Sequence, residues 1–146
     1  DHRDLHSFPT RRSSDLDGGA HVGTVCDASF PTFLLQHWGR DRERGRLPIE
    51  HLVHMQTGAT AAYIGMHDRG VLETGRRADV NVIDFERLAL RSPEMQHDLP
   101  AGGQRLMQRA DGYIATLVAG EPIVENGCLT GARPGRLARS RGRQQA

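Results

Sequence analysis

Hydrophobic positions in the first half of the chain recur at helical spacing. Between Phe30 and Trp38 the apolar side chains fall three to four residues apart, and Pro31 stands near the start, where its fixed φ angle suits a first helical turn. The charged stretch 39–45 interrupts this pattern. After it, Pro48 opens a second helix with an apolar side formed by Ile49, Leu52, Val53 and Met55. These intervals predict two helices separated by a polar loop.

A third, shorter helix is expected over residues 57–66 and is ended by Gly70, so residues 17–70 are expected to be a loop followed by helices. The residues expected to pack inward from this third helix are Ala59, Ala62, Tyr63 and Ile64. We interpret three aromatic side chains as part of a core rather than as a cage around a substrate, namely Phe33, Trp38 and Tyr63.

From Val71 onward the hydrophobic period changes to that of strands. Residues 79–84 and 113–118 are apolar runs that predict strands, and Asp79 is expected to anchor the first of them by local hydrogen bonds. A Pro- and Gly-rich segment, 91–103, is expected to be irregular. Gly120-Glu121 is expected to turn the chain into a strand over 122–125, and Asn126-Gly127 to turn it again, which predicts a β-hairpin. Helices followed by a small β unit predict two modules.

The first sixteen residues do not resemble the rest of the chain. Residues 1–16 match one reading frame of a common short-read sequencing adapter when they are translated back into codons. A polar, disordered tail is the alternative interpretation, and neither carries function. The expected division is therefore a non-native, disordered tail at 1–16, a last catalytic loop with helices at 17–72, a β module at 73–131 and an Arg-rich tail at 132–146.

Charge and cysteine usage narrow the class of protein. The formal net charge is +1, so nothing favours nucleic acid or a membrane surface as a partner. The Arg-rich end could bind an anion, but a solvated tail is the simpler interpretation. Cys26 and Cys128 lack disulfide or metal-site spacing and are expected to be free thiols. No apolar run approaches the roughly 20 residues that span a bilayer, and a cytoplasmic protein is expected.

The candidate chemistry begins at Asp17, which is followed by Gly18-Gly19-Ala20-His21. An acidic residue before two glycines suits a strand end that turns into an active-site loop, although a carboxylate that caps a turn has the same pattern. His21 could contact substrate or metal, or make a structural hydrogen bond. His51 and His54 lie three residues apart on one helix, but no third ligand accompanies them, so we interpret them as structural.

Several segments, in this order and spacing, resemble the amidohydrolase superfamily, and within it the N-acyl-D-amino-acid deacylase (D-aminoacylase) branch. The resemblance covers residues 17–139. The segments that carry it are Asp17 to Gly23, Thr57 to Leu72, Gly75 to Asp84, Asp98 to Gly103 and Thr130 to Arg136. The last two favour the deacylases over dihydroorotase-like or deaminase relatives.

The resemblance implies an α/β fold, in which this chain is the C-terminal piece of a TIM (β/α)8 barrel, from the end of strand 8 through the following helices, plus part of a small β-sandwich. It implies zinc at the C-terminal face of the barrel and an N-acyl-D-amino acid as the small-molecule substrate. Asp17 then matches the residue that is metal ligand and general base in the family. The base takes a proton from a zinc-held water, whose pKa falls to about 7. Gly19 and His21 become candidate substrate-binding residues.

The chain lacks the other residues that such a site needs. The family's early His-x-His pair and further histidines would lie on strands that precede Asp17, so we expect this chain to lack the N-terminal part of its own protein. Alone, it is expected to be inactive and to expose apolar surface. Two alternatives stay open: a cyclic-amide hydrolase of the dihydroorotase or hydantoinase kind, or a short non-catalytic binding module.

The nucleotide sequence of the parent gene tests this interpretation. We expect coding sequence to continue upstream of the Asp17 codon, without residues 1–16, and to encode a His-x-His pair. Genomic sequencing across this junction gives the measurement. An open reading frame that begins near codon 17 would contradict the deacylase interpretation and favour the binding module.

Overall fold

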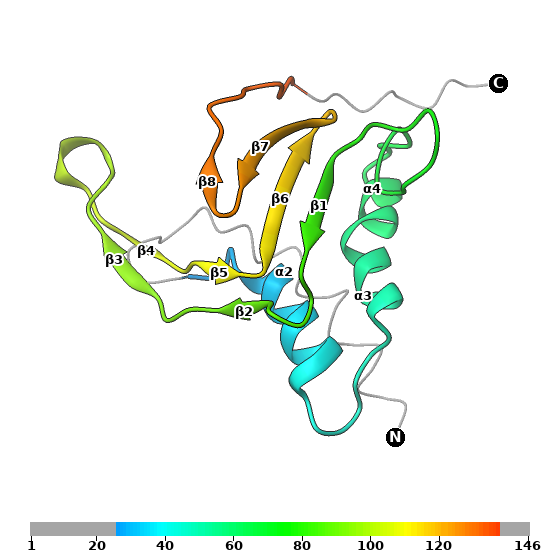
Figure 1. Ribbon diagram of the computed structural model, residues 1–146, viewed down its shortest axis with the longest axis horizontal. Helices are drawn as coiled ribbons and strands as arrows, with labels where there is room; N and C mark the ends of the chain where they lie inside the picture. Colours follow the sequence, from blue (N-terminus) through cyan, green and yellow to red (C-terminus); the bar gives the residue numbers. More distant parts are fainter. Residues whose placement is uncertain (1–25, 138–146) are drawn as a thin grey trace.

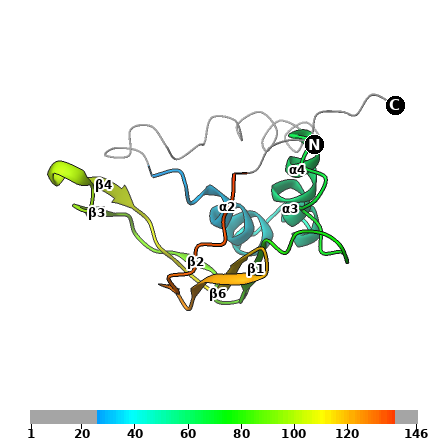
Figure 2. The ribbon, with the colours of Figure 1, turned by 90° about the horizontal axis from the view of Figure 1, so that it is seen from above.

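The computed structural model describes residues 26–137, in which the α- and π-helices precede the strands (Figure 1). The helical segments are α2 (Phe30–Phe33), the π-helix η1 (Leu34–Asp41), α3 (Ile49–Gln56) and α4 (Gly58–Tyr63). The three expected helices are therefore confirmed. They lie to one side of the β-strands (Figure 2).

The first helix changes geometry along its length. It begins in α2 after Ser29, with Pro31 in its first turn, and runs directly into η1. The wider turns of η1 carry it to Asp41, into the charged stretch that was expected to end it. The Arg42 amide then donates to His37 O at 2.9 Å, and Arg42 itself is extended. Short π segments of this kind change which side chains face a neighbouring element.

Four strands form one antiparallel sheet in the order β1-β6-β7-β8. Their bounds are β1 Val80–Ile83, β6 Tyr113–Val118, β7 Glu121–Glu125 and β8 Cys128–Leu129. The two-residue turn Asn126-Gly127 has positive φ at both residues, as type I′ hairpin turns require, and is confirmed. The preceding turn is formed by Ala119-Gly120, one residue earlier than expected, because Glu121 already pairs with Val118.

Two further strand pairs lie in or beside the segment expected to be irregular. They are β2 (Ala89–Leu90) with β5 (Ala110–Asp111), and β3 (Glu94–Gln96) with β4 (Arg105–Met107), the latter joined through the short helix η2 (Pro100–Gly102). The expectation of an irregular 91–103 is thus wrong for β3. Its three residues Glu-Met-Gln are too few and too polar to show alternation, and pairing with β4 alone makes them a strand.

The buried core joins the helices to the β unit. Leu35, Leu52 and Leu88 are its buried members, and both Leu52 and Leu88 are fully buried. Partly buried residues packed against them include Trp38, Phe85 and Tyr113. Since Leu88 comes from the turn between β1 and β2, both sides of the proposed boundary near residue 72 contribute to this core. The division into 17–72 and 73–131 stays a prediction.

The inward-facing residues predicted for the third helix are wrong. Ala61 is the buried residue of α4, whereas Tyr63 is 90% exposed and Ile64 is 49% exposed. The segment that contains Gly70 packs closely against α4 at Ala61, since a Cβ placed on Gly70 would lie 2.9 Å from the Ala61 Cβ. This contact determines which side of α4 is buried. Phe33, which was expected in the core, is also exposed at 46%.

Substitution of Gly112 by alanine is expected to destabilise the fold by about 3 kcal/mol or more. Gly112 has φ +92, and a Cβ there would lie 2.7 Å from Leu88 Cα and 2.9 Å from Asp84 O. Left-handed backbone costs alanine roughly 1–2 kcal/mol and overpacking adds about 1–3 kcal/mol. Urea unfolding of the 146-residue chain, followed by the fluorescence of its one tryptophan, gives the measurement.

Gly75→Ala is the matched control for this substitution. Gly75 has a similar φ of +87 but nothing within 4 Å of its would-be Cβ, so its cost should stay near the roughly 1–2 kcal/mol of the backbone alone. Equal losses in the two variants would show that the close approach of Leu88 does not matter.

Candidate active site

Asp17, Gly19 and His21, the predicted site residues, lie outside the described residues. The description begins five residues after His21, at Cys26. The structure therefore shows how the chain that directly follows the predicted catalytic loop is held, and which groups surround it.

Four polar side chains on one side of α2 and η1 connect this helical segment to the β unit. Their spacing of three, four and four residues places them in line along the helix. We call them the polar face, and they are Ser29, Thr32, Gln36 and Arg40. This set was not predicted from the sequence. In the sequence these four residues appear as polar positions at helical spacing between the apolar ones. That pattern indicates a buried contact only when the partner strands are known.

Two members of the polar face bind residues of the strands. Thr32 is buried, and its hydroxyl lies 2.7 Å from the Tyr113 hydroxyl in β6. Gln36 Oε1 accepts a hydrogen bond from the Leu90 amide at 3.0 Å, at the end of β2. Each contact satisfies a polar group that would otherwise lose hydration as the helix packs on the β unit.

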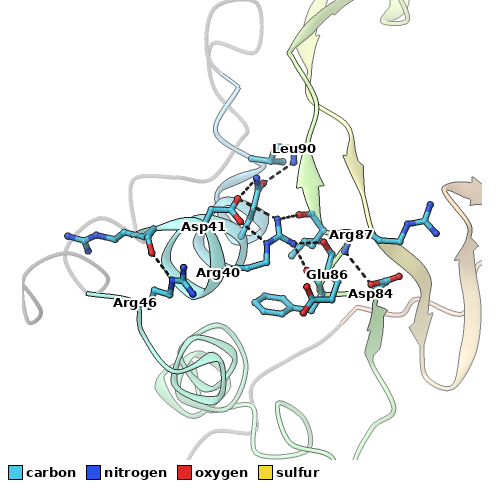
Figure 3. A network of polar contacts seen from close by, with 11 residues as sticks. Arg40, Asp41, Arg46, Asp84, Glu86, Arg87 and Leu90 are labelled. Carbon is cyan, nitrogen blue, oxygen red and sulfur yellow. Dashed lines mark hydrogen bonds and ion pairs between the residues drawn. The ribbon is translucent and has the colours of Figure 1, made fainter. Parts of the chain in front are cut away.

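Arg40 makes the most extensive contact of the polar face (Figure 3). Its guanidinium donates to three backbone carbonyls of the turn after β1, those of Phe85, Glu86 at 3.0 Å and Leu88 at 2.8 Å. Its Nε also donates to Asp41 Oδ1 at 2.7 Å. One cation thus holds the turn that carries Leu88 into the core.

The ion pair with Asp41 keeps this guanidinium oriented. Hydrogen bonds from Arg40, and then from Gln36 Nε2, hold the pKa of the Asp41 carboxyl below its usual range. The hydrogen bond with Asp41 in turn raises the pKa of Arg40. Both groups therefore remain charged at neutral pH, and the contact is insensitive to pH until the carboxyl is protonated in acid.

Ser29 binds a different part of the β unit, beside a groove. Its hydroxyl donates to Gln108 Oε1 at 2.5 Å, and Gln108 Nε2 donates to Arg91 O at 2.8 Å. The groove has a volume of about 330 Å³. Residues 26–29 and Thr32 line one wall, and residues 105–108 with Leu90 and Ala110 line the other. It is therefore bordered by the segment that continues from the predicted catalytic loop.

A larger hollow, of about 660 Å³, lies along the loop that leads from α4 to the sheet. Charged groups there are paired with one another: Arg69 binds Asp68 and Asp79, and Arg76 binds Glu73. Asp79 also accepts from Arg77 and from the Ala119 amide at 2.9 Å. The expectation that Asp79 anchors the strand entry is confirmed, and these contacts explain the loop structurally.

The described residues do not fit a metal site by themselves. Between residues 26 and 137 no group of three or more His, Cys, Asp or Glu side chains could hold a metal ion. His51 and His54 are exposed on α3. Cys26 and Cys128 are free thiols, as expected. Within the same range, no helix is long and apolar enough to cross a membrane.

Residues 12–124 match the Amidohydrolase family, so the chain belongs to this family. The match begins inside the segment 1–16, whose interpretation as non-native stays a prediction. The chain is also 34% identical to the D-aminoacylase of Alcaligenes xylosoxydans xylosoxydans over 109 residues, which cover 75% of this chain and 20% of the relative.

Two solved structures of D-aminoacylase are similar to the described fold. One is the crystal structure that defines D-aminoacylase as a novel subset of amidohydrolases, with 29% identity and a TM-score of 0.53. The other concerns the functional role of the binuclear metal centre in D-aminoacylase, with 30% identity and a TM-score of 0.54. Each comparison covers 70% of this chain and 19% of the solved chain. The chain thus spans about a fifth of the length of these relatives, and its resemblance to the D-aminoacylase branch is confirmed.

Replacing Arg40 by methionine is expected to reduce the free energy of unfolding by about 2–3 kcal/mol. Methionine keeps most of the apolar stem but leaves the carbonyls of the turn without their charged donor. Urea unfolding of the 146-residue chain, with the fluorescence of Trp38 as the signal, measures the loss.

Arg44→Met is the matched control, because within the described part of the chain no hydrogen bond or ion pair of the Arg44 side chain is seen and the residue is exposed. Its effect should stay within about 0.5 kcal/mol. If both variants lose the same stability, Arg40 does not hold the turn.

Proposed function

We propose that this chain is the C-terminal part of a zinc-dependent amidohydrolase that cleaves the amide bond of N-acyl-D-amino acids. Membership of the Amidohydrolase family and the likeness to D-aminoacylase by sequence and by fold support this proposal. The binuclear metal centre of one structural relative supports the use of metal. That the metal is zinc and that the substrate is an N-acyl-D-amino acid are the more specific parts of the proposal.

Asp17 is the proposed metal ligand and general base. Gly19 and His21 are the proposed substrate-binding residues. In this proposal the remaining ligands belong to an N-terminal part of the protein. Residues 26–137 hold no group of three or more His, Cys, Asp or Glu side chains that could bind a metal ion. In this proposal Asp17 ends the eighth strand of a TIM barrel, the β unit is part of the small β-sandwich, and the protein acts in the cytoplasm.

The observation that carries the proposal is the likeness to D-aminoacylase in both sequence and fold. Loops at the C-terminal face of a barrel position catalytic groups, and their precision depends on what holds their ends. Here the polar face fixes the segment that follows the loop through side-chain contacts at Ser29, Thr32, Gln36 and Arg40.

The exposed apolar residues agree with a missing partner segment. Large hydrophobic side chains that are at least 80% exposed among the described residues include Tyr63, Leu72, Leu129 and Leu137. By comparison, Leu52 and Leu88 are the largest fully buried side chains among the described residues. We infer that the upstream part of the protein covers some of this surface.

Activity of the full-length parent enzyme tests the proposal. The parent should hydrolyse N-acetyl-D-amino acids, lose this activity to a chelator and regain it with Zn²⁺. Asp17→Asn should reduce kcat by about 10³-fold or more, because a positioned base contributes about 10²–10⁴-fold and a metal ligand is lost as well. Asp68→Asn, at an exposed ion pair, should change kcat less than twofold.

The 146-residue chain alone should show no hydrolysis above a metal-free control. Hydrolysis of cyclic imides in place of N-acyl-D-amino acids by the parent would replace the proposed substrate with the cyclic-amide alternative. Zinc-dependent activity of the chain alone would show that it holds a complete site.

A further inference from the structure

The turn between β7 and β8 contains an asparagine followed directly by a glycine. Asn126 and Gly127 form this turn in the last hairpin of the sheet (Figure 1). The side-chain amide of asparagine is thermolabile, because the backbone nitrogen of the next residue can attack its carbonyl carbon. Glycine hinders this attack least, since it has no Cβ and leaves the backbone free to rotate. The turn is therefore a candidate modification site, and its surroundings decide whether the two groups can react.

Both reacting groups of the turn are free of hydrogen bonds. Asn126 and Gly127 are exposed to solvent. Among the described residues, no hydrogen bond of the Asn126 side chain is seen, and the Gly127 amide binds no acceptor. A Cβ placed on Gly127 would meet nothing within 4 Å, so the side chain and the nitrogen can approach each other without displacing a neighbour.

The strand that follows the turn is short and little covered. β8 consists of Cys128 and Leu129, which are both exposed, Leu129 at 85%. Beyond β8, the Thr130 amide donates to Ile123 O at 3.0 Å. Elements with exposed backbone hydrogen bonds and few apolar contacts open locally while the rest of the protein stays folded. Opening of this hairpin supplies the backbone rotation that the attack needs.

We propose that Asn126 is a site of spontaneous deamidation, with water as the only co-reactant. The Gly127 nitrogen loses its proton to hydroxide and forms a bond to Asn126 Cγ. The bond from Cγ to Nδ2 breaks, the nitrogen takes a proton from water and leaves as ammonia, and a succinimide ring remains. Water then opens the ring at either carbonyl carbon, which gives an aspartate or an isoaspartate at position 126. This inference does not depend on the proposed function.

Either product changes the last hairpin of the sheet. An aspartate places a second negative charge beside Glu125, and an isoaspartate also lengthens the main chain of the turn by one methylene group. The tight turn sets the register in which Glu125 pairs with Cys128 and Val124 with Leu129. Because the longer chain does not fit this turn, isoaspartate formation should release β8 from β7.

The other asparagine of the chain is the matched control. Asn81 is also exposed, but it lies in β1, and its Oδ1 accepts a hydrogen bond from Thr116 Oγ1 at 2.9 Å. The β-branched Val82 follows it. The 146-residue chain is kept in neutral buffer, either folded or unfolded in urea, and its peptides are followed by mass spectrometry. The rate in urea measures the intrinsic reactivity of each asparagine, so the ratio of the two rates isolates the effect of the fold.

In the folded chain, Asn126 should gain about 1 Da at a rate within about tenfold of the rate in urea. Part of the product should be isoaspartate, which an isoaspartyl methyltransferase labels. Asn81 should stay unmodified in the folded chain over the same period. The rate at Asn126 should rise with pH, because the Gly127 nitrogen must lose its proton. In the modified fraction, hydrogen exchange of the Thr130 amide should be faster.

A folded-chain rate at Asn126 that is slower than this limit overturns the proposal, because the fold then protects the turn. Equal rates at Asn126 and Asn81 in the folded chain also overturn it. Gly127→Ala should slow the reaction in urea, where strain in the turn has no effect. An unchanged rate in that variant, or a product without isoaspartate, would show that the reaction does not pass through the succinimide.

Discussion

The structure depends on the contact between the Arg40 guanidinium and the backbone carbonyls of the turn after β1. This turn carries Leu88 into the core, so the cation holds in place a residue that is fully buried. Arginine suits this task because its planar donors can serve several carbonyls at once and its charge is permanent. Removal of the donor would leave the carbonyls unsatisfied, which costs more than the bonds themselves contribute.

This contact matters more here than it would in a larger core. The buried hydrophobic residues of the described range are Leu35, Leu52, Ala61 and Leu88. Burial of these side chains does little to fix the orientation of the helix on the β unit, since apolar contacts can be repacked. The polar face fixes the relative position of the helix and the β unit, because each of its side chains hydrogen-bonds a particular group of the β unit. The same line of contacts extends from the core to Ser29, and so joins the stability of the β unit to the segment next to the predicted active site.

Much of the secondary structure could be predicted from the sequence. Pro31 and Pro48 mark helix starts, and Asn126-Gly127 forms the expected hairpin turn, because these residues restrict the backbone wherever they occur. The pair β3 and β4 was not predicted, since a three-residue strand has no periodicity to detect. The buried side of α4 was predicted wrongly, because Gly70 approaches Ala61 from another segment and decides which residue is covered.

The sequence by itself determined the order of helices and strands, the hairpin turn and the membership of the Amidohydrolase family, all of which follow from local residue preferences and from the order of short motifs. Tertiary structure alone decided which polar residues of the helix bind the β unit. Arg40 and Leu88 are 48 residues apart, and Thr32 and Tyr113 are 81 apart. No local pattern encodes such pairs, because the sequence pattern of a polar residue at helical spacing is the same whether its side chain faces water or a carbonyl. Packing of the strands against the helix removes the water and makes the contact specific.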